Sequence, residues 1–139
     1  MYADVRLQHI GIVQLKQIRL SMNTPETFDF KFYEWEEKFR DKPFLKQPFG
    51  DEWEIYTWGE VGQYARKLAT GLRSLGLREN AHIGLISKNC REWIIADLAI
   101  VMAGYISVPF FPNLTSGEIN KLLTFGDVDL LFAGKVEDW

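Results

Sequence analysis

The stretch AHIGLISKNCREWIIADLAIVMAGYISVPF, from Ala81 to Phe110, decides the fold. It opens with a short apolar run, HIGLIS, and closes with a second one, YISVPF. Between them, the segment from Trp93 to Ala103 is apolar nearly all round, and Gly104 ends it, so we expect a helix buried on most of its sides. The pattern predicts a strand, a crossover helix and a second, parallel strand.

The turn after the first of these strands, Ser87-Lys88-Asn89-Cys90, lacks the glycine-rich sequence that cradles phosphate in many such units. In open α/β sheets, ligands bind beyond the carboxyl ends of the strands, where Lys88 and Asn89 are expected. Asn89 and Glu92 also have the spacing of a capping box. We therefore interpret Asn89 as a helix cap and Lys88 as a solvated side chain, since a lone cap carries little specificity.

Helix and strand signals continue to alternate on both sides of this unit. Upstream, Thr57 and Glu60 form a capping box, and the helix that follows ends at Gly76. Downstream, TSGEINKLL starts a third helix at Thr115 or Ser116, and VDLLFAG is a further strand. This alternation predicts part of a three-layer, doubly wound α/β domain with a mostly parallel sheet. The chain stops soon after the last strand, so we expect a domain truncated at its C-terminus.

The segments before Thr57 are less regular. FDFKFYEWEEKF, from Phe28 to Phe39, predicts a short helix, and EWEIYTW, from Glu52, predicts a strand. The segment from Lys42 to Asp51 contains two prolines and a glycine, which indicates a loop or an edge strand. On the helix after Thr57, three basic residues are expected to face solvent: Arg66, Lys67 and Arg73.

Composition narrows the class of protein. The 139 residues suffice for one domain with a core, and the net charge of −3 gives no electrostatic support for binding nucleic acid. The single cysteine, Cys90, fits a reducing compartment. The longest nearly apolar run is too short to span a bilayer, and nothing resembles a signal peptide. We expect a cytoplasmic protein.

The first twenty-one residues do not follow the pattern of the rest. Their apolar residues fit neither the helical nor the strand period, and Met22 is followed by what looks like an ordinary protein start. We therefore predict that residues 1–21 are an upstream or disordered extension. N-terminal analysis of the protein made from its native gene would test this.

Isolated reactive residues give no recognisable site. Cys90, at a helix start, has the position of an activated thiolate, but His82 lies a strand length away and His9 is remote, so we expect neither a Cys/His dyad nor a zinc site. Glu34, Glu36 and Glu37 are interpreted as a solvated helix face.

Aspartates and aromatic residues also have structural interpretations. Asp127 and Asp129 flank a turn into a strand, where aspartate is common. We expect four tryptophans to make core or domain contacts: Trp35, Trp53, Trp58 and Trp93. We also expect core or domain contacts for PFFP, from Pro109 to Pro112. In the alternative interpretation, its two phenylalanines line an apolar ligand site.

The order of the blocks YTWGEV, ARKLATGLRSLGL, IGLISKNCREW, AIVMAGYISVPFFP and LTSGEINKLL resembles the amino-terminal region of acyl-adenylate-forming (AMP-binding) enzymes, most of all long-chain fatty acyl-CoA synthetases. The match covers Tyr56 to Leu123 well and Phe28 to Trp139 loosely. Asn80-Ala81, where many relatives have Gly-Asp, and Phe110-Phe111 depart from the family pattern and leave the substrate preference in doubt. The resemblance implies that residues 22–139 are the N-terminal portion of the family's large domain.

The resemblance also implies a reaction for the parent protein. A carboxylate attacks the α-phosphate of Mg-ATP to give an acyl-adenylate, and the thiol of coenzyme A then displaces AMP. The family's phosphate loop, its acid near Mg²⁺, its ribose-binding aspartate and its mobile lysine match nothing in residues 1–139. We therefore assign no catalytic, cofactor-binding or metal-binding residue, and we expect the chain alone to be inactive and to bind no ATP, Mg²⁺ or coenzyme A.

Two alternatives remain at this point. One is an aryl-CoA ligase or another adenylation domain, and the other is a free-standing, non-enzymatic α/β binding module. The fragment interpretation predicts self-association through bare strand edges and apolar helix faces. Contact of the parent enzyme with a membrane surface is open, since fatty substrates partition into membranes.

Overall fold

A computed structural model describes residues 28–136 of the chain, and side chains from residue 31 onward. The proposed extension at residues 1–21, its boundary at Met22 and His9 lie outside the described residues. The elements, in chain order, are α2 (Phe28–Phe39), β1 (Pro43–Phe49), β2 (Glu52–Thr57), α3 (Trp58–Ser74), β3 (His82–Ile86), α4 (Arg91–Met102), β4 (Ile106–Phe110), α5 (Ser116–Phe125) and β5 (Val128–Ala133).

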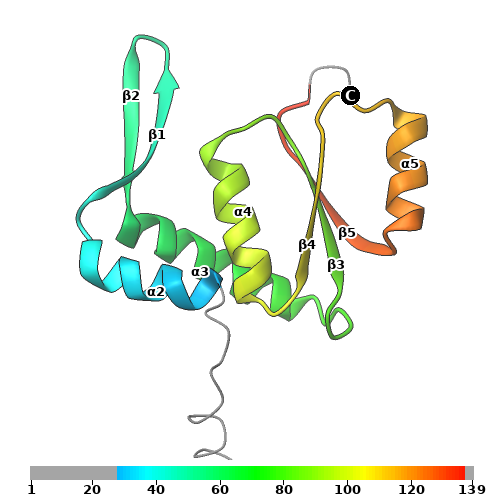
Figure 1. Cartoon of the computed structure of the whole chain (residues 1–139), viewed down its shortest axis with the longest axis horizontal. Helices are drawn as coiled ribbons and strands as arrows, with labels where there is room; N and C mark the ends of the chain where they lie inside the picture. Colours follow the sequence, from blue (N-terminus) through cyan, green and yellow to red (C-terminus); the bar gives the residue numbers. More distant parts are fainter. Residues whose placement is uncertain (1–27, 137–139) are drawn as a thin grey trace, which may run out of the picture.

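The main sheet has the strand order β4-β3-β5, and both pairings are parallel. Helix α4 joins β3 to β4, helix α5 joins β4 to β5, and the two helices cover opposite faces of the sheet (Figure 1). From the central strand β3 the chain passes to β4 at one edge of the sheet, and from there to β5 at the other edge. Right-handed crossovers therefore place the two helices on opposite faces. The predicted three-layer, doubly wound α/β architecture is confirmed.

Helix α4 is buried on most sides, as its apolar sequence predicts. It packs between the sheet and α3, and its buried residues are Ala96, Leu98, Ala99, Ile100 and Met102. The facing side of α3 buries Val61, Ala65, Ala69 and Leu72. Gly76 and Gly104 follow the two helices with φ of +65° and +86°, the left-handed conformation that glycine adopts without strain. Both predicted helix ends are confirmed.

The opposite face of the sheet is closely packed around Gly84 in β3. A Cβ at this position would lie 2.8 Å from Leu131 Cδ1 and 3.0 Å from Phe110 Cε2. The side chains of the two edge strands therefore meet over the central strand only because residue 84 has none. Helix α5 begins at Ser116, as predicted, and buries Ile119 on this side. A capping box of Thr115 and Glu118, which was not predicted from the sequence, lies at this end of the helix.

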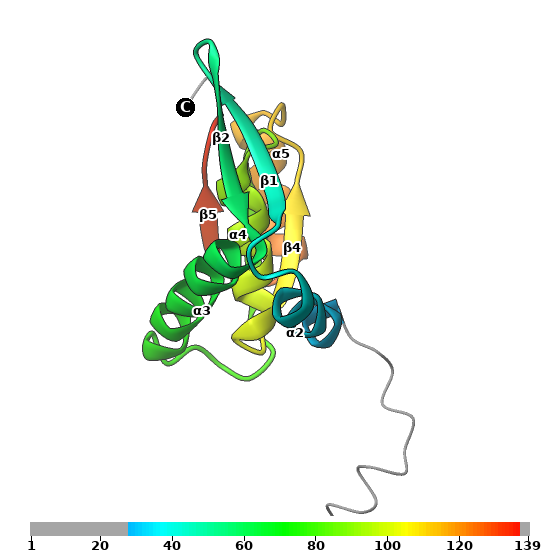
Figure 2. The same ribbon diagram turned by 90° about the vertical axis from the view of Figure 1, so that its left-hand side faces the viewer.

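Strands β1 and β2 form a separate antiparallel hairpin, which we call the arm (residues 43–57). It projects from the side of the molecule formed by α2 and α3, away from the three-stranded sheet (Figures 1 and 2). The segment from Lys42 to Asp51, predicted as a loop or an edge strand, is thus an edge strand. Pro48 is tolerated there because only one side of β1 is paired.

Two expectations about charged side chains are corrected. Glu36 does not lie on a solvated face: it is 5% exposed and accepts two hydrogen bonds from Arg66, at 2.6 and 2.8 Å. Arg66 therefore pairs with α2 instead of facing solvent alone. Arg73 is exposed as expected, yet its guanidinium donates to the carbonyls of Met102 and Ala103 at the end of α4. Both contacts join segments about thirty residues apart, which a helical periodicity does not reveal.

No helix within residues 28–136 has the length and the apolar character needed to cross a membrane.

Candidate functional site

The crevice where a ligand is expected lies between β3 and β5. Ligands of doubly wound sheets bind beyond the carboxyl ends of the strands, at the point where the strand order reverses. Here the chain leaves β3 toward β4 and returns on the other side of β3, so the reversal lies between β3 and β5. Residues 87–90 after β3 and residues 134–135 after β5 frame this crevice.

Hydrogen bonds between its own two loops close this crevice. The Gly134 N–H donates to the Ile86 carbonyl at 2.8 Å, and the Lys88 N–H donates to the Lys135 carbonyl at 2.9 Å. The Ser87 hydroxyl accepts from the Lys135 N–H at 2.9 Å. A Cβ on Gly134 would lie 2.5 Å from Ser87 Oγ, so the two loops are in direct contact at this point. Three backbone N–H groups of these loops, those of Lys88, Gly134 and Lys135, are thus already hydrogen-bonded within the protein.

The N-terminus of α4, the other expected anion site, is also occupied by the protein itself. The predicted capping box of Asn89 and Glu92 is wrong, because the N-cap is Cys90 and its side chain makes no capping hydrogen bond. Instead, Gln47 Oε1 of β1 accepts the Arg91 N–H at 2.8 Å. This acceptor comes from 44 residues upstream, so the local sequence gives no sign of it.

Glu92 adds negative charge at the same helix end. Burial of this carboxyl favours its neutral form, but hydrogen bonds from its own backbone N–H, from Arg91 and from Cys90 outweigh that effect and hold its pKa below the usual value. A carboxylate in the first turn also complements the helix dipole. An added anion would therefore meet a helix end whose Arg91 N–H is already bonded to Gln47 and where the Glu92 carboxylate already places a negative charge.

Cys90 and His82 lie apart, as the sequence predicts. The Cys90 thiol is half-buried, 3.8 Å from the Ser87 hydroxyl at the carboxyl end of the sheet. His82 begins β3 at the opposite end, where its Nδ1 lies 2.5 Å from the Gly126 carbonyl oxygen. Within the part of the chain that the structure describes, no group of three or more His, Cys, Asp or Glu side chains could hold a metal ion.

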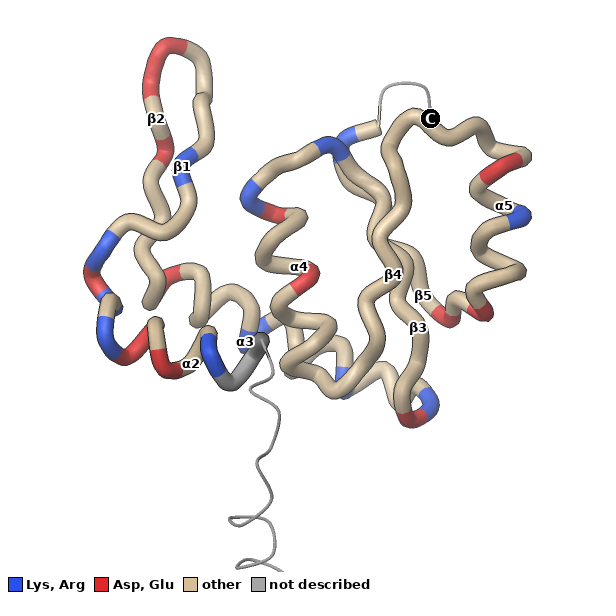
Figure 3. Tube along the Cα trace, viewed as in Figure 1, with Lys and Arg blue, Asp and Glu red and all other residues tan. Residues whose placement is uncertain are grey.

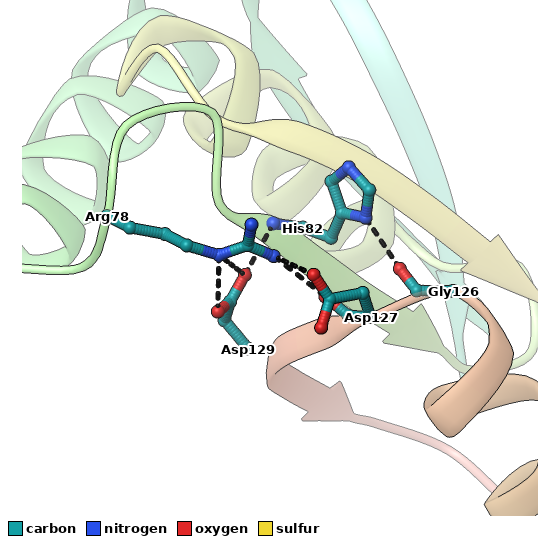
Figure 4. Close-up of polar contacts among 5 residues, drawn as sticks. All are labelled: Arg78, His82, Gly126, Asp127 and Asp129. Carbon is teal, nitrogen blue, oxygen red and sulfur yellow. Dashed lines mark hydrogen bonds and ion pairs between the residues drawn. The ribbon is translucent and has the colours of Figure 1, made fainter.

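Asp127 and Asp129 belong to a network at the amino end of the sheet (Figure 4). Arg78 donates to Asp127 at 2.6 Å and to Asp129 at 2.9 Å, and the His82 N–H donates to Asp129 at 2.9 Å. The hydrogen bond from Arg78 is the main reason why the pKa of the Asp129 carboxyl lies below its usual value. The predicted turn role holds for Asp127, whose φ is +48°. The ionic role of both residues was missed, because Arg78 lies about fifty residues away.

Two clefts flank Trp93 on either side of the start of α4. The larger, of about 400 Å³, lies against the arm and is lined by Leu45, Lys46, Gln47, Pro48, Asn89, Cys90, Arg91, Trp93 and Ile94. The smaller, of about 260 Å³, lies against β5 and reaches the two loops of the crevice through Ser87, Gly134 and Lys135. The rest of its lining is mainly apolar and includes Leu85, Ala96 and Phe132. Titratable side chains in the lining of the smaller cleft are Cys90, Glu92 and Lys135, and Glu92 is bonded to Arg91. Phe110 and Phe111 line neither of these two clefts.

The tryptophans divide into core and exposed residues. Trp58 stacks on Phe44 with 3.9 Å between ring centroids and also contacts Trp35 and Phe32, so its predicted core role is confirmed. Trp53 is 64% exposed on the arm, so of the two predicted roles, core or domain contact, the core role is wrong for this residue and the domain contact stays a prediction. Along the traced residues 28–136, the positions of Lys and Arg are distributed over several elements (Figure 3).

Comparison with known proteins decides the family. The sequence profile described as AMP-binding enzyme matches residues 32–138. The chain belongs to the AMP-binding enzyme family. This establishes the relationship that the order of the sequence blocks indicated, and the structure of the described residues is consistent with it.

Individual AMP-binding relatives differ in the acid that their names specify. The chain is 29% identical over 107 residues to the long-chain-fatty-acid–CoA ligase heimdall of Drosophila melanogaster, covering 74% of this chain and 16% of that protein. It is 32% identical over 107 residues to 4-coumarate–CoA ligase 1 of Solanum tuberosum, covering 73% of this chain and 19% of that protein. The chain thus spans less than a fifth of these curated relatives.

A solved structure supports the fold. The fatty acid AMP ligase from Legionella pneumophila matches with a TM-score of 0.70 at 17% identity, over 78% of this chain and 19% of that one. At this identity the likeness concerns the fold alone. It shows that the doubly wound arrangement of this chain recurs within a much longer AMP-binding enzyme.

Proposed function

We propose that the chain is a scaffold segment of the large domain of an ATP-dependent fatty acid–CoA ligase. In that reaction a carboxylate and ATP give an acyl-adenylate, and the acyl group is then transferred to coenzyme A. The observation that carries the scaffold role is the closed crevice between β3 and β5, where Ser87 and Lys88 bond to Lys135. The match to the AMP-binding family and the fatty-acid ligases among the relatives support the reaction.

The described residues do not fit ATP, Mg²⁺ or coenzyme A. The two loops of the crevice bond to each other, and the adjacent cleft of about 260 Å³ is lined mainly by apolar groups. The Arg91 N–H at the start of α4 bonds to Gln47 beside the Glu92 carboxylate, and no cluster within residues 28–136 offers a set of metal ligands. We therefore derive no catalytic step for this chain. Its role in the proposed enzyme is to hold a rigid sheet on which other segments of the protein carry the reacting groups.

The second candidate is a ligase for aromatic acids. It is favoured by the relative with the higher identity of the two compared above, the 4-coumarate ligase at 32%. Nothing in the described residues separates a long aliphatic acid from an aromatic one. The distinction therefore has to be made with the full-length product of the native gene.

The experiment measures acid-dependent release of pyrophosphate from ATP by that full-length product, with hexadecanoate, butyrate and 4-coumarate compared at equal concentrations. We expect the highest kcat/KM with hexadecanoate. A preference for 4-coumarate would favour the second candidate. If no acid supported pyrophosphate release, the ligase proposal would be wrong and a non-enzymatic binding module would be the better description.

The 139-residue chain alone serves as the companion sample. We expect it to release no pyrophosphate with any of the three acids and to form no acyl-CoA. Activity of the isolated chain would contradict the scaffold role without affecting the family assignment. A cytoplasmic location also stays a prediction, which fractionation of cells producing the full-length protein tests.

A further inference from the structure

The arm is attached to the rest of the protein at two levels. At its base, Phe44, Leu45 and Tyr56 pack against the core cluster. Farther out, Gln47 of β1 and Glu54 of β2 stand opposite each other across the hairpin. Both of these side chains bond to the same partner, the first residue of α4.

That partner, Arg91, contacts both strands of the arm through different parts of one residue. Its backbone N–H donates to Gln47 Oε1 at 2.8 Å, and its guanidinium donates to the Glu54 carboxylate. The same guanidinium lies 4.6 Å from the centroid of the Tyr56 ring, in cation–π geometry. Its Nε donates to Glu92 at 2.6 Å, which fixes the orientation of the group.

The outward side of the arm offers no comparable support. Trp53 and Ile55 are exposed there, and Phe49 near the tip is 71% exposed. A two-stranded hairpin is only marginally stable without a packed face. The position of the outer half of the arm therefore depends on the contacts of Arg91. The cleft of about 400 Å³ lies between β1 of the arm and the start of α4.

We infer that Arg91 is a latch that holds the arm against the start of α4, and that the arm hinges about its base to open the cleft beside Trp93. Opening separates Gln47 and Glu54 from Arg91 while the base residues stay packed on the core. The hinge lies within the arm, at the pair Lys46 and Ile55, between the packed base and the pair Gln47 and Glu54. This inference is independent of the proposed reaction, since it concerns only contacts within residues 44–92.

Pulsed electron spin resonance between two nitroxide labels tests the latch in the full 139-residue chain. The labels are placed through Asp51→Cys at the tip of the arm and Lys121→Cys on α5, in a Cys90→Ser background. The labelled chain is diluted into excess unlabelled chain, so that distances between associated copies do not contribute. We expect one narrow distance distribution with Arg91 present. Arg91→Ala should raise the population of other distances roughly tenfold, because it removes hydrogen bonds to a charged group. Arg91→Lys should lie between the two.

Arg78→Ala is the matched control, since Arg78 also pairs with two acidic residues but at the amino end of the sheet. It should leave the distance distribution narrow. Amide exchange of β3 shows whether each variant keeps its core; if Arg91→Ala does not, Glu54→Gln replaces it as the milder break of the same latch. An unchanged narrow distribution in a variant with a protected β3 overturns the inference, as does equal broadening by Arg78→Ala.

Discussion

Gly84 shows how a single missing side chain sets the packing of one face of the sheet. Leu131 and Phe110, from the two edge strands, approach to within about 3 Å of where its Cβ would be. The strand pattern of HIGLIS predicts the strand but gives no reason for a glycine in it. The reason becomes visible only once β4 and β5 are placed on either side of β3.

We predict that Gly84→Ala lowers the free energy of unfolding by about 1–3 kcal/mol, because the added methyl overpacks this face. Gly71→Ala is the matched control: it lies within α3 with open space around it, so alanine should raise stability by about 0.5–1 kcal/mol. Urea denaturation of both variants measures the two changes. A neutral Gly84→Ala would show that Leu131 and Phe110 move aside freely.

Asp129 makes part of the stability depend on pH. Its pKa is lowered chiefly by the hydrogen bond from Arg78, so the carboxylate is favoured in the folded state. The folded-state pKa thus lies below the unfolded value of about 3.9. The stabilisation is complete above that value and is lost as the pH falls through the folded-state pKa.

We therefore predict that Asp129→Asn lowers the urea midpoint at pH 7, and that wild type and variant converge as the pH falls below the unfolded-state pKa. Comparison of the two proteins removes the effect of the other acidic groups, which both share. The measurement is a series of urea midpoints taken across this pH range. A difference between the two proteins that stays constant down to acid pH would show that the ionised state of Asp129 contributes nothing.

At the scale of elements, the start of a helix could be predicted where its capping residue lies nearby in the sequence. The cap could not be predicted where the acceptor comes from a distant segment. The predicted capping box of Thr57 and Glu60 is present, and the predicted start of α5 at Thr115 or Ser116 is correct, with a capping box within four residues there as well. The cap of α4 failed as a prediction because its acceptor, Gln47, comes from the arm. The closed crevice between β3 and β5 was equally hidden, since its bonds join residues about fifty apart.

The attachment of α2 to α3 rests on the buried carboxylate of Glu36. Its side chain is 7% exposed, whereas that of its partner Arg66 is 40% exposed. Removing the partner would leave a buried charge without compensation, while Arg66 without Glu36 can turn to water. The two halves of the ion pair should therefore differ in their effect on stability.

We predict that Arg66→Ala lowers the free energy of unfolding by about 2–3 kcal/mol and Glu36→Ala by about 1 kcal/mol. The double variant should resemble Glu36→Ala, because the unpaired buried charge is then absent. Urea denaturation of the two single variants and the double variant gives all three values. Equal losses in the two single variants would contradict a burial penalty on Glu36.

At the scale of the whole molecule, the alternation of helices and strands was enough to predict a parallel, doubly wound sheet. The arm was harder to place, because EWEIYTW predicts a strand without indicating what lies beside it. In the structure its outer side exposes Trp53 and Ile55, and the sheet ends at β4 and β5. Such apolar surfaces and open strand edges favour pairing between copies.

We predict that the 139-residue chain associates as its concentration rises, with the arm as a main contact. Light scattering across a concentration series should show a mass above that of the 16.2 kDa monomer. Trp53→Lys should shift the association to higher concentration, because it places a charge on the apolar side of the arm. Phe125→Lys is the control, since Phe125 is 91% exposed at the end of α5 and away from the arm. A compact monomer at all concentrations would contradict the prediction, and equal effects of the two substitutions would place the contact elsewhere than on the arm.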